Sequence, residues 1–294
     1  MHIHHIFTDP RIIFLFLILF AESSWQICGM NDYIMDKEIK DNLIRWLSSC
    51  VDLLLPRTCI VCGRKLLPDE KHLCLHCRMD LPLTHFWKRT HNPMADKFNL
   101  IIQKELEQGW DAGHCREERY AYACALFFYS TDAGYIRITR GLKYKGDIPS
   151  GTYFGRMLGR QMATSTHFSD VGIVIPVPLH WRRRWERGYN QAEVIAAEVA
   201  RELGAELRCD ILERVRSTMT QTKMSVEDKS TNVRGAFKVK DRKCLLQMTD
   251  GGHILLLDDV FTTGATLHAC YLALREVLPM HVRISVATLG FVGR

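Results

Sequence analysis

The hydrophobic pattern in the second half of the chain alternates between short continuous apolar runs and longer stretches with helical spacing. The continuous runs have the length of buried strands and occupy residues 121–129, 172–177, 253–257 and 282–289. The stretches with apolar residues every three or four positions are 135–145, 151–162, 190–203 and 265–277. Strands that are apolar on both faces and alternate with helices predict a parallel sheet with helices on both faces.

The first half of the chain is organised differently. Several apolar side chains fall on one helical face, namely Ile34, Ile39, Leu43, Trp46 and Leu47. They predict an amphipathic helix over residues 30–56, ending at Pro56. A cysteine-containing module over 57–90 and a poorly patterned connector over 91–119 follow, and the α/β domain is expected over 120–294.

Residues 1–29 include ten consecutive apolar residues, from Ile12 to Ala21. A bilayer span takes about 20 apolar residues, so this run is too short to cross, although it has the length of a signal-peptide core. We expect the segment to be an upstream misreading of the start codon, with translation beginning at Met30 or Met35. A true signal or anchor and a folded extension are the alternatives.

Composition narrows the class of protein. Hydrophobic residues make up 47% and charged residues 24% of the 294 residues, which is typical of a globular chain and not of a disordered one. The net charge of +6 favours an anionic ligand without establishing one. Of the eleven cysteines, four form two CxxC pairs and the rest are single. This distribution predicts a cytoplasmic protein with a metal site, and not a disulfide framework.

The stretch from Leu255 to Thr266 reads LLLDDVFTTGAT. We expect a buried strand to run out into Asp258 and Asp259, and a threonine turn around Gly264 to open a helix. The free N–H groups at a helix start attract phosphate, and glycine lets the backbone approach an anion. Two carboxylates at the end of a strand can accept hydrogen bonds from a vicinal diol. The stretch therefore predicts a phosphosugar site; a capped strand–turn–helix junction is the plainer alternative.

This motif resembles that of the type I phosphoribosyltransferases, which bind 5-phosphoribosyl diphosphate (PRPP) with Mg²⁺. The resemblance implies that Asp258 and Asp259 hold the ribose hydroxyls. It also implies that the 5′-phosphate is bound by the loop residues Thr262, Thr263, Gly264, Ala265 and Thr266.

A basic segment, WRRRWERGYNQAE, follows the strand at 172–177 and is predicted to be a loop. Guanidinium groups bind phosphate bidentately, and the interleaved Trp181, Trp185 and Tyr189 offer stacking surfaces for bases. The candidates for binding phosphate or nucleic acid are Arg182, Arg183, Arg184 and Arg187, together with Lys143 and Lys145. A solvated basic loop anchored by its tryptophans is the alternative.

Two CxxC pairs lie eleven residues apart, Cys59 with Cys62 and Cys74 with Cys77. Four thiolates in two such pairs can bind Zn²⁺ tetrahedrally in a closed structural site. His72 and His76 are candidates to replace a thiolate. Reduced cysteines without a metal and a redox-active pair are the alternatives.

Taken in order, these motifs resemble the ComF family, which is linked to competence and DNA uptake. The resemblance extends from about Leu54 to Leu289 and includes Asn92-Pro93, LKYKGD at 142–147, PVPL at 176–179 and RGYNQ at 187–191, as well as LERVRSTMTQ at 212–221 and NVRGAF at 232–237. It implies a zinc finger followed by a phosphoribosyltransferase-like domain. Lys229 stands where family members commonly have an arginine, and the loop on the pyrophosphate side lacks the glycine-rich form of well-characterised transferases.

Three functions are compatible with these motifs. The first is a PRPP-binding protein that handles incoming single-stranded DNA together with the uptake machinery. The second is an active phosphoribosyltransferase, similar to the amidophosphoribosyltransferases, that transfers ribose 5-phosphate to an unidentified acceptor. The third is a nucleic-acid-binding protein that senses PRPP as an effector.

Overall fold

The computed structural model describes residues 56–109, 118–129, 134–216, 235–248 and 252–293. The segment 1–29 and nearly all of the predicted helix over 30–56 lie outside these residues. By its internal contacts the chain divides into two compact units, one of residues 1–59 and 64–71 and the other of 60–63 and 72–294. In the first unit, Thr58 and Lys65 form an antiparallel bridge, and the Cys59 N–H donates to the Arg64 carbonyl over 2.7 Å.

Five parallel strands form the main sheet of the second unit. They are β1 (Ala123–Phe128), β2 (Val171–Pro176), β3 (Glu206–Leu207), β6 (His253–Phe261) and β7 (Arg283–Phe291). Their order is β1-β7-β6-β2-β3, and every neighbouring pair is parallel. The side chains of Leu255, Leu256 and Leu257 in the central strand are fully buried. The predicted parallel sheet is confirmed, and its coverage explains why the strands are continuously apolar.

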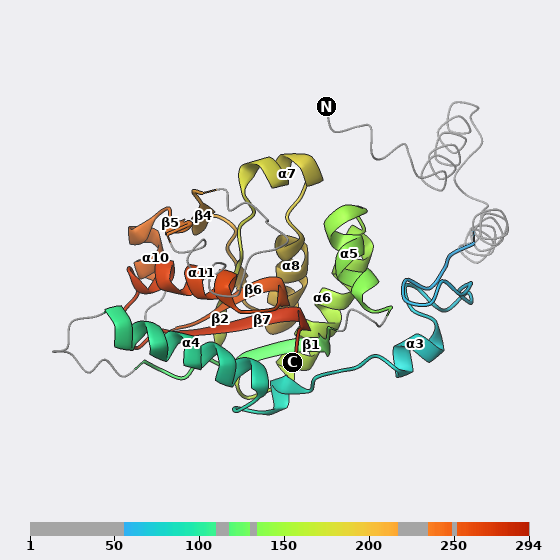
Figure 1. The fold of residues 1–294 in the computed structure, drawn as a ribbon, viewed down its shortest axis with the longest axis horizontal. Coiled ribbons are helices and arrows are strands. Elements are labelled where there is room, and N and C mark those ends of the chain that lie inside the picture. Colours follow the sequence, from blue (N-terminus) through green and yellow to red (C-terminus); the bar gives the residue numbers. More distant parts are fainter. Residues whose placement is uncertain (1–55, 110–117, 130–133, 217–234, 249–251, 294) are drawn as a thin grey trace, which may run out of the picture. The chain divides into compact units, whose positions relative to one another are not determined.

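Helices cover both faces of this sheet. On one face α6 (Ile148–Ala163) packs on β1 and β7, and α8 (Gln191–Leu203) packs on β2 and β6. On the other face α4 (Pro93–Gly109) packs on β1, while α11 (Ala265–Arg275) packs on β6 and on α4. The predicted α/β fold with two helical layers is therefore confirmed (Figure 1).

A stripe of glycines brings α6 close to α8. Gly151, Gly155 and Gly159 recur every fourth residue and so share one face of α6. A Cβ atom on Gly155 would lie 3.0 Å from the Ile195 carbonyl oxygen, and one on Gly159 would lie 3.0 Å from the Val199 Cα. The missing side chains let the two helix backbones approach, and Arg156 donates to Glu198 across the interface over 3.1 Å.

The remaining elements lie outside the main sheet. They are α3 (Leu75–Met79), the 3-10 helix η2 (Phe86–Lys88), α5 (Ile136–Tyr144), α7 (Trp181–Arg187), β4 (Leu212–Arg214), β5 (Phe237–Val239) and α10 (Arg242–Met248). Strands β4 and β5 form a separate antiparallel pair, and β5 packs against α11. Helix α5 packs against α6.

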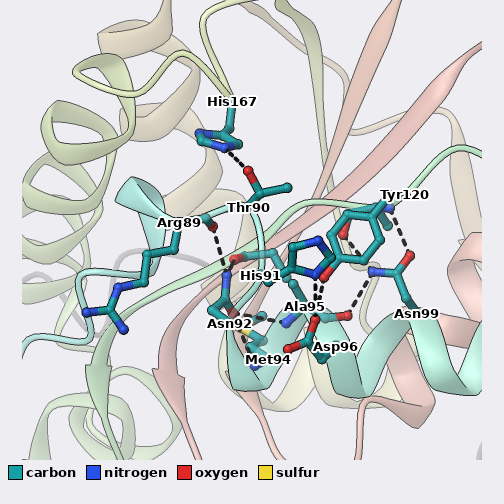
Figure 2. A network of polar contacts seen from close by, with 12 residues as sticks. Arg89, Thr90, His91, Asn92, Met94, Ala95, Asp96, Asn99, Tyr120 and His167 are labelled. Carbon is teal, nitrogen blue, oxygen red and sulfur yellow. Dashed lines mark hydrogen bonds and ion pairs between the residues drawn. The ribbon is translucent and has the colours of Figure 1, made fainter.

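Helix α4 lies in the segment to which the sequence analysis assigned no element. Asn92 starts it, because its side-chain oxygen accepts from the N–H groups of Met94 and Ala95 over 3.1 and 3.0 Å. The same side chain donates to the carbonyl of Ala123 at the start of β1 over 3.0 Å, so it joins the helix to the sheet. Figure 2 shows this buried asparagine at the centre of a polar network.

A second arm of this network is more exposed. His91 and the Tyr120 hydroxyl both contact Oδ1 of Asp96, at 3.1 and 2.7 Å (Figure 2). On the neighbouring turn, Asn99 accepts from the N–H of Ala121 over 2.9 Å. Asn92 and Asn99 therefore join α4 to the segment that leads into β1 and to the start of that strand.

Two further predictions about the elements were wrong. The basic segment is a helix, α7, and not a loop; His180 caps its start and Gly188 closes its end with a left-handed φ of 77°. None of its residues is buried, so it carries no apolar periodicity by which a helix is recognised. Strand β6 was expected to end at Leu257 but continues to Phe261, because β7 extends beside it as far as Phe291.

Candidate functional site

The acidic pair lies inside the last part of β6 and not beyond its end. Asp258 is in register with Thr288 of β7, and Asp259 is the next residue of the strand. The N–H of Asp259 donates to Oδ1 of Asp258 over 2.8 Å. The expectation that both carboxylates follow the strand is thus corrected, although they do lie near its carboxyl end.

The predicted phosphate loop follows directly and turns into α11. Thr262 is exposed, and the Thr263 hydroxyl accepts from the Ala265 N–H over 3.4 Å. Gly264 is buried at the N-cap of α11 with a φ of 84°. A Cβ atom there would lie 2.7 Å from Cζ of Phe261, so both its conformation and its surroundings require glycine. A pocket opens at this junction, lined by residues 258 and 260–267.

Helix α4 supports this loop from one side. The Lys97 ammonium donates to the carbonyl of Thr262 over 2.8 Å, and the Phe98 ring packs edge-on against Phe261 at 6.4 Å. The sequence analysis did not identify Lys97 or Phe98 as part of the site. Their signal in the sequence is the apolar spacing of Met94, Phe98 and Ile102, which is that of a helix.

Lys143 forms an ion pair with the acidic pair. Its Nζ lies 2.9 Å from Oδ2 of Asp259, which is only 4% exposed. Burial disfavours the charge on Lys143, but the attraction of Asp259 and Asp258 outweighs it and raises the pKa of Lys143. The sequence analysis named Lys143 as a phosphate candidate, whereas the structure places it on a carboxylate. It lies seven residues after the buried Ile136, on the inner face of α5.

Asp258 has a strongly perturbed carboxyl group. Burial of that group and the neighbouring charge of Asp259 raise its pKa to about 7, against the opposing effects of Lys143 and Arg214. Adjacent carboxylates repel each other, so Asp258 ionises less readily beside Asp259 than an isolated aspartate does. Among the residues that the structure describes, Lys143 and Arg214 thus act as counter-charges to Asp258.

Helix α7 displays the predicted basic and aromatic side chains. Trp181 and Trp185 are 66% and 84% exposed, and the Arg182 guanidinium lies 5.2 Å from the centre of the Trp181 ring. Arg184 forms two hydrogen bonds with the carboxylate of Glu193, at 2.7 and 3.2 Å. The segment is therefore an exposed helix whose aromatic rings are not buried as anchors.

Helices α5 and α7 contact each other beside the acidic pair. Arg187 lies 5.5 Å from the centre of the exposed Tyr144 ring and donates to Gln191. The Tyr189 hydroxyl donates to the carbonyl of Leu142. These contacts bracket Lys143 in the sequence, while Lys145 is exposed at the end of the helix.

The four predicted metal ligands come together. The sulfur atoms of Cys59, Cys62, Cys74 and Cys77 all lie within 4.8 Å of one another, and those of Cys62 and Cys74 are 3.7 Å apart. A tetrahedral zinc site with Zn–S bonds of about 2.3 Å separates its sulfur atoms by about 3.8 Å. The four-cysteine cluster therefore fits a metal ion, and four thiolates suit zinc.

The two candidate histidines have other contacts. The His72 ring lies 5.0 Å from that of Tyr153, and the exposed His76 has its Nδ1 atom 3.0 Å from Oδ2 of Asp80. The backbone of the four-cysteine cluster is also contacted from α5: the Tyr135 hydroxyl donates to the Cys77 carbonyl, and Arg137 donates to the Val61 carbonyl. Both donors belong to the start of α5, the helix that ends beside the acidic pair.

A serine–histidine–aspartate chain lies at the opposite end of β6. His253 contacts Asp170 over 2.6 Å and Ser285 over 2.7 Å. Burial lowers the pKa of His253 against the effect of Asp170. Ser285 is fully buried, and its hydroxyl accepts from the Tyr122 N–H. Because this hydroxyl is not accessible from the surface, we assign the three hydrogen-bonded side chains a structural role.

Two motifs fall partly or wholly outside the residues that the structure describes. They are the end of the stretch 212–221, from residue 217, and the segment around 229–234. Among the residues described, no helix has the length and apolar character needed to cross a bilayer.

Comparison with known proteins connects this geometry to a family. Residues 190–290, which contain α8, β6, α11 and most of β7, match the family model of the phosphoribosyl transferase domain. The chain is 30% identical over 221 residues to competence protein F of Haemophilus influenzae, covering 69% of this chain and 91% of that protein. It is 34% identical over 203 residues to DNA utilization protein YhgH of Salmonella typhimurium, covering 66% and 87%. The YhgH protein of Salmonella typhi is 25% identical over 203 residues.

Proposed function

Because the chain belongs to the ComF family of competence protein F and YhgH, we propose that it binds PRPP and assists the uptake or processing of single-stranded DNA. In this proposal the junction of β6 and α11 receives the ribose 5-phosphate. The exposed helix α7 receives the DNA.

One observation carries the proposal. In the last part of β6 a half-buried and a buried carboxylate, Asp258 and Asp259, precede a loop that turns at Gly264 with positive φ into the start of an eleven-residue helix. The first N–H groups of a helix attract an anion, and carboxylates accept hydrogen bonds from a diol. The parts needed for a sugar diol and its phosphate are thus adjacent. Mg²⁺ would arrive with the diphosphate group of PRPP.

Helix α7 supports the nucleic-acid part of the proposal. It follows β2, and α11 follows β6, so both begin at the carboxyl edge of the same parallel sheet. Exposed tryptophans next to arginines provide stacking surfaces for bases and charges for phosphates. The four-cysteine cluster would hold a structural zinc ion; its closed set of ligands gives the metal no role in the chemistry.

PRPP binding is tested by calorimetry with Mg²⁺ and PRPP. Replacing both acids, Asp258→Asn with Asp259→Asn, removes the charged acceptors of the diol and should weaken binding about a hundredfold or more. The control replaces the exposed Asp69 and Asp80 by Asn, which changes the net charge equally and should leave the affinity unchanged. Unchanged affinity in the first variant would mean that the acidic pair does not hold the sugar.

DNA binding is tested with a single-stranded oligonucleotide across a range of salt concentrations. Neutralising Arg182, Arg183 and Arg184 to Gln should reduce the slope of log affinity against log salt by up to about 2, since each phosphate contact contributes about 0.7. The matched control neutralises three arginines of the α6–α8 surface, Arg156, Arg160 and Arg201, which pair with Glu198 and Glu202. Equal effects in both variants would refute a specific role for α7.

A transferase activity is the second candidate, favoured by the match to the phosphoribosyl transferase domain. Here a nucleophile would form a bond to C1 of PRPP as the C1–O bond to pyrophosphate breaks. Such chemistry depends mainly on positioning and charge stabilisation. Pyrophosphate release measured with purine, pyrimidine and amine acceptors tests it; release above the level of the double Asn variant would establish turnover.

A further inference from the structure

Lys143 is the one lysine of α5, and its partner Asp259 belongs to the proposed PRPP site. We propose that Lys143 is a positioning residue that sets the charge state of the acidic pair, so that both carboxylates are ionised when the ribose diol arrives. The proposal rests on the proposed function of that site. It assigns Lys143 a role different from that of Lys145, which is exposed and free to meet a phosphate of the ligand.

The geometry supports a role toward the acids. The Lys143 ammonium is 2.9 Å from Oδ2 of Asp259, and its side chain is only 29% exposed, whereas that of Asp259 is 5% exposed. A lysine that served only as a surface charge would extend its ammonium into water. Lys143 instead pairs with a carboxylate that is almost completely removed from solvent.

The backbone around Lys143 is held from both sides. Tyr189 donates to the carbonyl of the preceding residue, Leu142, and Arg187 packs on the ring of the following residue, Tyr144. At the other end of α5, the hydroxyl of Tyr135 donates to the Cys77 carbonyl. The ammonium is therefore presented to Asp259 from an anchored helix.

The acids require a counter-charge. Asp258 faces Asp259, Lys143, Arg214 and the thiol of Cys270, and its pKa is already raised to about 7 with Lys143 in place. Tyr129 is the further titratable group that acts on Lys143. Without the ammonium, the pair would retain a shared proton to higher pH, because two adjacent carboxylates repel each other when both are ionised. A protonated carboxyl group is a poorer acceptor for the diol hydroxyls.

The experiment measures PRPP affinity against pH in the full-length protein, from about pH 5 to pH 9. In the wild type, affinity should rise with a midpoint near the titration of the pair. Lys143→Met should move that midpoint upward by about one pH unit or more, a tenfold change in proton affinity. Lys143→Arg keeps the charge and should restore the wild-type midpoint.

Two controls separate this role from simple attraction or misfolding. Arg140→Met removes a charge from the exposed face of the same helix and should leave the midpoint unchanged. Recovery of affinity by Lys143→Met at high pH shows that the variant is folded. An equal loss of affinity at every pH, with no shift of the midpoint, overturns the proposal.

A measurement without PRPP separates this proposal from the proposed function. Difference infrared spectroscopy follows the carbonyl band of protonated carboxyl groups against pH, with Asp258→Asn used to assign it. Lys143→Met should shift the titration of this band upward. If the wild type does not bind PRPP, the proposed function fails, and the infrared titration still decides the role of Lys143.

Discussion

Asn92 is expected to contribute more to stability than any exposed residue around it. Its side chain caps α4 through two N–H groups and also donates to the buried carbonyl of Ala123 (Figure 2). Loss of an N-cap costs about 0.5–2 kcal/mol. A buried carbonyl left without its donor costs about 1–3 kcal/mol. Asn92→Ala should therefore lower the free energy of unfolding by about 2–4 kcal/mol.

Urea denaturation and thermal melting measure this effect. At about 2–4 °C per kcal/mol for a domain of this size, Tm should fall by about 4–16 °C. Asn92→Ser keeps an acceptor for the N–H groups but loses the donor to Ala123, so its loss should be intermediate. His91→Ala, at the exposed neighbouring residue, should stay within about 0.5 kcal/mol of the wild type. An equally small effect for Asn92→Ala would refute the assigned double role.

Three shorter predictions concern the site and the metal. Gly264→Ala puts a Cβ against Phe261 in a left-handed conformation; we expect about 1–3 kcal/mol lower stability by denaturation and weaker PRPP binding by calorimetry, and wild-type values would contradict the argument. Because the pKa of Asp258 is raised on folding, the wild type should lose stability relative to Asp258→Asn as pH rises from about 4 to 7, and a constant difference in urea denaturation would exclude this. Metal analysis should find zinc bound to the wild type and to a variant of the exposed Cys209, Cys209→Ser, but not to Cys74→Ser; zinc retained by the last would reject the cluster.

The sequence predicted the sheet well because its strands are buried on both faces. Leu255 to Leu257 have no solvent-exposed side, so the run is continuously apolar and its meaning is unambiguous. The four cysteines were equally clear, since metal-binding pairs keep a fixed local spacing. Because both signals are local in the sequence, the α/β fold and the cysteine cluster could be predicted correctly.

Other features could not be predicted in this way. Helix α7 buries no side chain, so its pattern is that of a loop, and only its caps at His180 and Gly188 mark it. The pairing of Lys143 with Asp259 joins residues that are far apart in the chain, and spacing carries no information about such contacts. The loop's role in PRPP binding stays a prediction.

The glycine stripe of α6 has a consequence for the ligand. Two basic segments precede these helices: Lys143 and Lys145 come shortly before α6, and α7 comes shortly before α8. The backbones of α6 and α8 lie close together at the glycines. The gap between the basic segments is thus set during folding and is preorganised before any ligand arrives. A bulky side chain at Gly155 would change that gap, and with it the recognition of an anion, without touching either segment.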